Sequence, residues 1–376
     1  MTLTISSKFD AGNIEVISLE NPQNIQLKIE KDSHSEFLQW FYFRMQGAKD
    51  LSCKLNITNA GEAAYPEGWD NYHARASYDR VTWFQIPTSY KNGILSMEFT
   101  PKFDAVYFAY FAPFSYEQHL DLVNNAQLSS LCRLETVGET IQGRPIDFLR
   151  IGDDGSNKKN LWVIARQHPG ETMAEWFMLG LIYRILDEED ASSVSLLEKA
   201  NIYLVPNMNI DGSILGNLRV NAKGVNLNRE WASPDIENSP EVYYVKKKMK
   251  EIGMDFNLDV HGDEGLPYNF ISGIEGIPSF NDKLSKLTDS FMINWIANNP
   301  DMQDVHGYPK NDAGKANLNI CSKNLGEEFS CLSQTLEMPF KQNENIPDTV
   351  AGWSAERSVK LGESVVNVLL SIVDEL

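Results

Sequence analysis

The sequence predicts a two-part fold, in which an antiparallel β-sandwich over residues 1–116 is followed by an α/β domain over residues 117–376. Three observations support this prediction. The chain of 376 residues is longer than a usual single domain. Its first third consists of short apolar and aromatic runs without a long amphipathic helix. From residue 131 onward, strand-like runs alternate with helical patterns, which is typical of α/β folds.

The first part has the pattern of a sandwich because its strand-like runs are short and evenly spaced. Asn, Gly, Pro and Asp residues separate these runs, which cover residues 14–17, 25–29, 37–43 and 95–99. Two aromatic-rich segments, at residues 39–45 and 107–116, are expected to pack its core. Stacking on a ligand is a less favoured alternative for these rings.

The second part begins with a predicted helix over residues 115–130, which joins the sandwich to the α/β domain. The next predicted strands cover residues 146–151, 161–165, 202–206, 256–260 and 334–338. The predicted helices cover residues 172–186, 240–252, 278–298 and 351–375. Ser239 and Pro240 mark a helix start, since proline is favoured in the first turn.

Charge and cysteine content restrict the function. The chain has 33 basic and 52 acidic residues and a net charge of −19, which repels nucleic acid and anionic membranes. The first residues lack the basic start and apolar core of a signal peptide, so a cytoplasmic location is expected. The four cysteines form no CxxC pair, so neither a disulfide scaffold nor a cysteine zinc site is indicated.

A candidate metal site begins with His168 and Glu171, which lie three residues apart between a predicted strand and a predicted helix. An isolated HxxE also arises by chance, and catalytic zinc needs three protein ligands and one open position. His261 is the best third ligand, because it ends an apolar strand and precedes a Gly-containing loop. The other histidines are expected to have structural or surface roles; they are His34, His73, His119 and His306.

Two further features fit hydrolysis at such a site. Arg219 and the pair Asn228-Arg229 could hold a carboxylate and stabilise an oxyanion, although a surface loop with salt bridges is the alternative. Glu337 lies within an apolar run, where a carboxylate is costly to bury without a partner. Zinc lowers the pKa of bound water to roughly 7, and a carboxylate can take its proton and deliver it to the leaving amine.

The order of these motifs resembles the zinc carboxypeptidases of the carboxypeptidase A type over roughly residues 130–376. The motifs are HPGE, NLR, GVNLNREW, DVHGD and TLEMPF, in that order. The earlier segments FDAGNIEV, QWFYFRM and YFAYFAPFSY resemble the sandwich of the cytosolic carboxypeptidase subfamily. The resemblance implies a mixed-sheet catalytic domain preceded by that sandwich.

Carried over residue by residue, the resemblance makes His168, Glu171 and His261 the ligands of one zinc ion, with Glu337 as the general base. It further implies that Arg219 polarises the scissile carbonyl, and that Asn228 and Arg229 hold the C-terminal carboxylate of a peptide. Since only a free C-terminus satisfies such a clamp, exopeptidase action is expected.

Two positions depart from the family pattern. Many relatives carry a mobile tyrosine about twenty residues before the base, yet residues 311–329 contain none, and Tyr308, the nearest, is left unassigned. An aspartate often orients the first zinc histidine from the position that Asn226 occupies here. Because asparagine is a weaker acceptor, this change could reduce zinc affinity.

The preferred hypothesis is therefore a zinc metallocarboxypeptidase that hydrolyses the C-terminal amide bond of peptides. The alternative is a zinc amidohydrolase of the same fold, acting on N-acyl amino acids or peptidoglycan-derived peptides. A binding protein without activity would require a broken ligand or base position, whereas all four are present. The sequence does not determine which C-terminal side chain is preferred.

Overall fold

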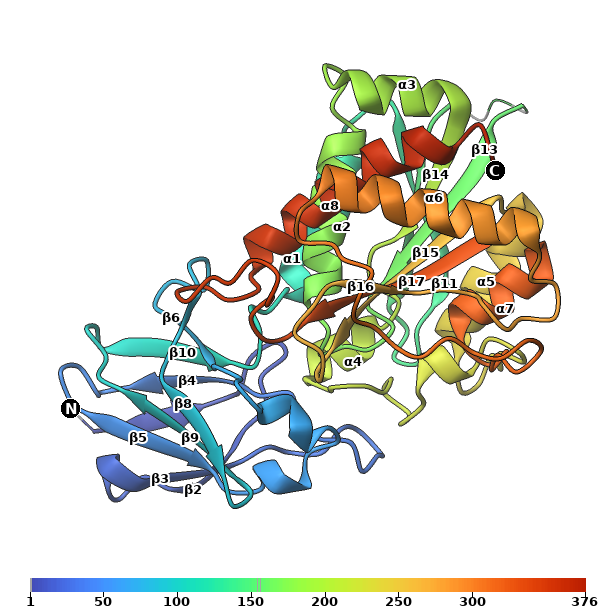
Figure 1. Ribbon diagram of the computed structural model, residues 1–376. Coiled ribbons are helices and arrows are strands. Elements are labelled where there is room, and N and C mark those ends of the chain that lie inside the picture. The colour runs from blue at the N-terminus through green and yellow to red at the C-terminus, as the bar shows by residue number, and fades with distance from the viewer. Residues whose placement is uncertain (1, 154, 156) are drawn as a thin grey trace.

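The computed structural model describes residues 2–153, 155 and 157–376. It has two parts, a smaller β-rich part that contains the N-terminus and a larger part built on one central sheet (Figure 1). The two parts share a hydrophobic core, since one cluster of buried side chains extends from Ile25 in the first to Leu369 in the second. Tyr110 and Phe340 stack across the junction, with their ring centroids 4.4 Å apart.

The N-terminal part is a sandwich of two five-stranded sheets. One sheet contains, in spatial order, β1 (Thr4–Ser6), β4 (Tyr42–Gln46), β10 (Ala105–Ala109), β6 (Arg75–Ser77) and β7 (Phe84–Gln85). The other contains β2 (Glu15–Ser18), β3 (Ile25–Lys28), β5 (Cys53–Ile57), β9 (Ile94–Phe99) and β8 (Thr88–Lys91). Pairing is antiparallel except between β3 and β5, which run parallel. The predicted sandwich is confirmed, and its aromatic residues pack the core, as in the stacked pair Phe43 and Phe108.

The strand predicted over residues 37–43 begins only at Tyr42. Residues 38–41, just before it, are buried but do not form a strand. There the Gln39 side chain makes two hydrogen bonds with the backbone of Tyr65, similar to those that a neighbouring strand would make. Its amide oxygen accepts the backbone N–H of Tyr65 at 2.9 Å, and its nitrogen donates to the Tyr65 carbonyl at 3.0 Å. This arrangement brings Tyr65 beside the chain that leads into the sandwich.

The larger part has a seven-stranded mixed sheet, which confirms the predicted fold class. In spatial order the strands are β11 (Cys132–Glu139), β12 (Pro145–Ile151), β14 (Ala200–Val205), β13 (Lys159–Ala165), β15 (Phe256–Asp263), β17 (Leu332–Pro339) and β16 (Phe270–Ser272). The four strands from β14 to β17 are parallel, and the strands at both edges pair antiparallel. The carboxyl ends of the parallel strands therefore meet at one edge of the sheet, where α/β folds place ligands.

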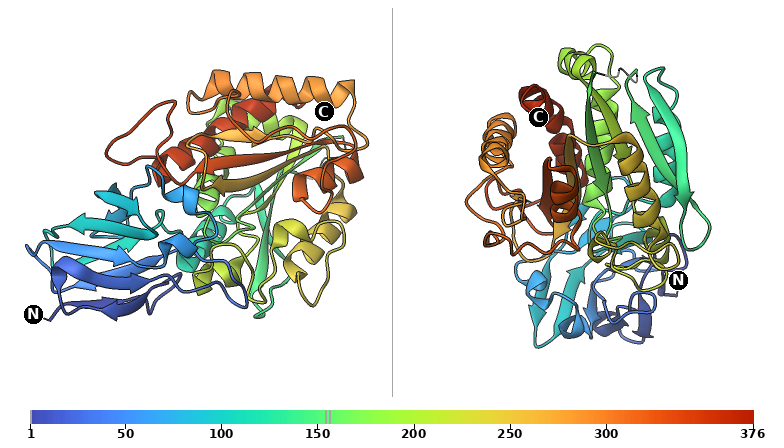
Figure 2. Two further views of the ribbon diagram at one scale, coloured as in Figure 1. Left: turned by 60° about the horizontal axis from the view of Figure 1, so that its bottom comes forward. Right: turned by 90° about the vertical axis from the view of Figure 1, so that its right-hand side faces the viewer.

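Helices cover both faces of this sheet (Figure 2). They are α1 (Tyr116–Ala126), α2 (Met173–Ile185), α3 (Ala191–Lys199), α4 (Ile210–Leu215), α5 (Pro240–Ile252), α6 (Asp282–Asn298), α7 (Cys321–Phe329) and α8 (Ala355–Ile372). Strand β13 is apolar on both sides because Val163 joins the core shared with α2 and α8, whereas Trp162 joins the core shared with α5 and α7. The long predicted helices are present, although α6 begins at Asp282, later than predicted.

Helices α2 and α8 approach closely at two glycines. A Cβ atom at Gly180 would lie 2.0 Å from the carbonyl oxygen of Val359, and one at Gly362 would lie 2.0 Å from that of Phe177. Only glycine fits at either position. Within the described residues, no helix has the length and apolar character needed to cross a membrane.

Candidate metal and substrate site

The candidate metal ligands meet at the carboxyl ends of β13 and β15. His168 and Glu171 lie in the loop between β13 and α2, and His261 lies within β15. The loop is folded tightly, since a Cβ at Gly170 would lie 3.0 to 3.1 Å from atoms of Leu218. All three ligand side chains are buried. The structure thus brings together three residues that are widely separated in the sequence.

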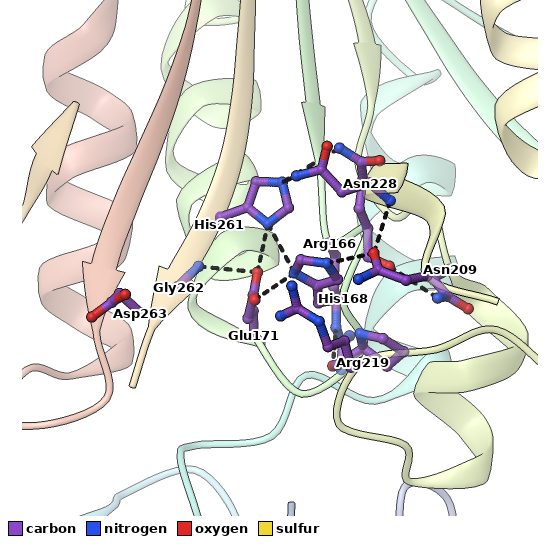
Figure 3. A network of polar contacts seen from close by, with 12 residues as sticks. Arg166, His168, Glu171, Asn209, Arg219, Asn228, His261, Gly262 and Asp263 are labelled. Atoms are coloured by element: carbon purple, nitrogen blue, oxygen red, sulfur yellow. Dashed lines mark hydrogen bonds and ion pairs between the residues drawn. The ribbon is translucent and has the colours of Figure 1, made fainter. Parts of the chain in front are cut away.

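Their donor atoms converge on one point (Figure 3). His168 Nδ1 lies 2.6 Å from Glu171 Oε1, His261 Nδ1 lies 2.8 Å from Glu171 Oε2, and the two Nδ1 atoms are 3.2 Å apart. One atom from each residue lies within 4.8 Å of the others. Two nitrogens and a carboxylate are the donor types that catalytic zinc sites use.

The far side of each imidazole ring is fixed by a hydrogen bond. His168 Nε2 donates to Asn226 Oδ1 at 3.0 Å, and His261 Nε2 donates to Asp259 Oδ2 at 3.0 Å. With a proton on each Nε2, both Nδ1 lone pairs point toward each other and toward a carboxylate. A cation at this point would contact both nitrogens and the carboxylate, so the donor set fits a zinc ion.

The charges around the two rings differ. Burial lowers the pKa of His168 to about 4, and the nearby Arg219 cation adds to this effect. Burial also favours the neutral form of His261, but the carboxylates of Asp259 and Glu171 outweigh it and raise the pKa of His261. His168 is therefore the ring that is held neutral, as a metal ligand must be.

Glu337 lies beside the metal ligands because β17 is the neighbour of β15. It is the direct partner of His261 in the parallel register of the two strands. Its Oε2 atom is buried and has no hydrogen-bond partner among the described residues. Burial raises the pKa of Glu337 well above its usual value, His261 opposes this shift, and the negative charges of Glu171 and Asp263 add to it. A buried carboxylate with a free oxygen and a raised pKa is suited to carrying a proton.

Arg219 approaches the same point from the loop after α4. Its side chain lies beside Glu171 and His168 (Figure 3), and its guanidinium carbon lies 5.6 Å and 5.5 Å from the ring centroids of Phe37 and Tyr65. Both rings belong to the N-terminal part. The sequence predicted the arginine but not the residues that surround it.

Asn228 and Arg229 lie in a short 3₁₀ turn, Leu227–Arg229, that also faces this region. Burial and the like charge of Arg219 lower the pKa of Arg229, whereas the negative charge of Glu337 opposes this shift. The Asn228 side-chain nitrogen lies 3.3 Å from His261 Nε2, and its oxygen accepts the backbone N–H of Cys321 at 2.8 Å. Asn228 is thus packed against the candidate ligand His261, and Arg229 is the more exposed member of the pair.

Tyr308, left unassigned from the sequence, lies near this region. Its hydroxyl group donates to Asp263 Oδ2, and its ring packs edge-on against Phe270 at 4.9 Å between centroids. The side chain is 46% exposed. Negative charge from Glu337 is among the causes that raise the pKa of Tyr308, after burial, so the phenol and the candidate base interact.

Two residues of this region had not been singled out from the sequence. Asp259 could have been found, because residues two apart in a strand share one face and His261 follows it at that spacing. Asp32, which accepts backbone N–H groups of the Arg219 loop, gave no such signal. It lies in the N-terminal part, far from the loop in sequence.

Comparison with known families assigns both parts of the chain. Residues 5–111 match the cytosolic carboxypeptidase N-terminal domain, and residues 116–252 match the zinc carboxypeptidase family. Mouse cytosolic carboxypeptidase 6 is 27% identical over 72% of the chain, which spans 55% of the length of that relative.

Two solved structures are similar over the whole chain. A metallo-carboxypeptidase from Burkholderia cenocepacia is 45% identical, with a TM-score of 0.98 and 100% of both chains covered. A metallo-carboxypeptidase from Pseudomonas aeruginosa, in complex with (2-guanidinoethylmercapto)succinic acid, is 43% identical, with a TM-score of 0.97 and 99% of both chains covered. The chain therefore belongs to the zinc carboxypeptidase family and carries the N-terminal domain of its cytosolic carboxypeptidase branch.

Proposed function

We propose that the protein removes C-terminal residues from peptides, using one zinc ion held by His168, Glu171 and His261. The observation that supports this proposal most strongly is the convergence of both Nδ1 atoms on the Glu171 carboxylate, directly beside the buried Glu337. Zinc held there would lower the pKa of a water molecule and polarise a carbonyl group. The family supplies the general class of reaction, metal-dependent peptide hydrolysis.

Each remaining residue has a separate role in the proposed reaction. Glu337 accepts the proton of the attacking water at its free oxygen and later donates a proton to the leaving amine. Arg219 donates hydrogen bonds to the oxygen on which negative charge develops. Because the substrate carbonyl must approach the metal ligands, the position of Arg219 beside Glu171 and His168 supports this role.

Arg229, assisted by Asn228, is proposed to bind the free carboxylate of the last substrate residue. A guanidinium group suits a carboxylate because two parallel hydrogen bonds can form. The Pseudomonas aeruginosa relative was solved with a succinic acid derivative, and a carboxylate ligand of this kind is consistent with such a clamp. The proposed substrates are therefore peptides or peptide-like chains with a free C-terminus.

The proposal is tested by two matched comparisons. The purified protein should contain one zinc ion per chain and should hydrolyse a blocked dipeptide but not the same dipeptide with an amidated C-terminus. Glu337→Gln should keep the zinc and lower kcat by about 10²- to 10⁴-fold, whereas Glu356→Gln, at an exposed position, should change neither. A Glu337→Gln variant as active as the parent would refute the proposal. Faster hydrolysis of N-acyl amino acids than of peptides would favour the amidohydrolase alternative, which the comparisons do not favour.

We further propose a cytoplasmic location and a division of the chain at residues 116 and 117. The first is supported by the cytosolic carboxypeptidases among the relatives. The second is supported by the limits of the two family matches, which end at 111 and begin at 116.

A further inference from the structure

A turn of the N-terminal sandwich reaches into the loop that carries Arg219. Asp32, which is 4% exposed, lies at the start of this turn. Its carboxylate accepts three successive backbone N–H groups of that loop, from Leu218 at 2.6 Å, from Arg219 at 2.7 Å and from Val220 at 3.2 Å. A carboxylate that binds three successive backbone donors fixes the backbone at that point, because each donor constrains a separate peptide unit.

The turn that presents Asp32 is itself well fixed. The backbone N–H of Asp32 donates to the Phe37 carbonyl at 2.8 Å, which closes the turn. Ser33 adds a second attachment, since its backbone nitrogen and its hydroxyl group donate to Asn217 Oδ1 at 3.0 and 3.1 Å. Residues 217 to 220 are thus held by two neighbouring residues of the other part of the molecule.

The same part of the molecule holds the Arg219 side chain. Phe37, at the end of the turn, and Tyr65, held by Gln39, place their rings 5.6 and 5.5 Å from the guanidinium carbon. In the part of the chain that the structure describes, no hydrogen bond or ion pair engages this guanidinium group. The rings therefore orient the cation through cation–π contacts while its N–H donors stay available.

The loop is attached to the metal site on its other side. The backbone N–H of Gly170, between His168 and Glu171, donates to the Leu218 carbonyl at 2.8 Å. The backbone of Leu218 thus makes two hydrogen bonds: its N–H donates to Asp32, and its carbonyl accepts the N–H of Gly170. Leu218 therefore connects the sandwich to the loop that carries His168 and Glu171.

Asp32 and Glu264 attract Arg219 electrostatically, but among the described residues no carboxylate is paired directly with its guanidinium group. Arg229 is close enough for its pKa to be lowered by the charge of Arg219, so the two cations repel. A carboxylate paired with Arg219 would hold it, but would compete with the substrate for the same donors. Aromatic faces and a backbone clamp avoid this competition.

We propose that Asp32, together with the rings of Phe37 and Tyr65, positions the Arg219 guanidinium for catalysis, so that the N-terminal sandwich supplies part of the active site. This inference rests on the proposed role of Arg219 in carbonyl polarisation. Asp32, Phe37 and Tyr65 are positioning residues, since they act through Arg219 and not on the substrate.

The first test replaces Asp32 by asparagine, which keeps the size of the side chain but turns an N–H donor toward the loop. Asp32→Asn should lower kcat for a blocked dipeptide by about 10- to 100-fold, with KM within about threefold of the parent, since the carboxylate clamp at Arg229 is retained. Asp10→Asn is the matched control, because Asp10 also accepts a backbone N–H from the other side of the junction, that of Tyr116 at 2.7 Å. It should leave kcat unchanged.

The second test uses the rings. Tyr65→Leu removes an aromatic face and should lower kcat, whereas Tyr65→Phe keeps the face and should retain the parental kcat. This pair also serves if Asp32→Asn fails to fold. Melting temperature and zinc content, measured for every variant, identify losses of activity that come from unfolding.

The decisive measurement is a double-mutant cycle. Arg219→Ala alone should lower kcat strongly, and adding Asp32→Asn to it should lower kcat by less than about twofold, because the group that Asp32 positions is gone. If the two effects multiply, or if Asp32→Asn and Tyr65→Leu keep the parental kcat while Arg219→Ala loses it, the inference is wrong and the proposed function stands. If Arg219→Ala is fully active, the proposed role of Arg219 fails, and the inference fails with it.

Discussion

Asn226 is a single residue that is expected to affect how strongly the candidate metal site binds zinc. Its amide oxygen accepts the Nε2 proton of His168, at the position where relatives of this type often carry an aspartate. A neutral acceptor withdraws the ring proton less than a carboxylate does, so the Nδ1 atom is a weaker base and a weaker ligand.

We therefore expect Asn226→Asp to bind zinc more tightly, by about 10-fold or more. The new carboxylate can keep the second contact of Asn226, which accepts the backbone N–H of Asn228 at 3.1 Å. Zinc affinity is measured by competition with a chromogenic chelator. The control is Asn298→Asp, at an exposed position, which should leave the zinc affinity unchanged. Asn221 is not used because it is fully buried, so a new carboxylate there would be costly to bury.

Local sequence pattern was sufficient to single out the candidate metal ligands, which the structure brings together, and the candidate base beside them. His261 and Glu337 lie within strands, and His168 and Glu171 lie in the loop that follows β13; in each case the apolar run of the strand is long enough to recognise. The contact of Asp32 with Arg219 spans 187 residues, and no local pattern encodes it. An isolated aspartate in a turn has the same sequence signature whether it faces solvent or binds another part of the chain.

Among the elements, α1, α2 and β12 are joined by a buried charged network behind the site. His119 on α1 contacts Glu175 on α2 at 2.6 Å and Asp147 on β12 at 3.0 Å. Arg166 donates to the same Glu175 at 2.5 Å. The sequence had suggested a core or surface role for His119, and the structure places it in the core. Shorter elements, such as α3, α7 and β16, were not predicted because a few residues show no clear period.

This network predicts a loss of stability at alkaline pH. Burial opposes the charge on His119, but Glu175 and Asp147 outweigh it and raise its pKa from 6.5 to about 9. Because the folded pKa is higher than the unfolded one, the contribution of His119 to the free energy of unfolding is complete below pH 6.5 and is lost as the pH rises to about 9.

We expect this loss to be on the order of 3 kcal/mol. Urea unfolding at pH 6, 7.5 and 9 measures it, and His119→Gln removes the titrating group. The difference in unfolding free energy between parent and variant should shrink as the pH rises. A difference that stays constant over this range would show that His119 does not change its charge there.

For the whole molecule, the net charge of −19 acts on the approach of substrates. The charged groups proposed to bind substrate are arginines, whereas the long-range field of the protein is negative. The arginines therefore favour a negatively charged peptide once it is bound, whereas the long-range field favours the approach of a positively charged one.

We expect kcat/KM for an acidic peptide to rise with salt between about 10 and 200 mM, and kcat/KM for a basic peptide to fall, because salt screens the field beyond about 10 Å. A neutral peptide of the same length is the control. Equal salt dependence for all three peptides would show that local charge at the site controls association.

The pairing of His261 with Glu337 across neighbouring parallel strands has a consequence for how this protein can diverge. The separation of these two residues is set by the spacing between strands, about 4.8 Å, which is common to all sheets. Arg219, by contrast, lies on a loop attached to another part of the molecule. Mutations in that loop or in the turn at Asp32 are therefore expected to change the rate through Arg219, whereas the distance between His261 and Glu337 remains that of the sheet.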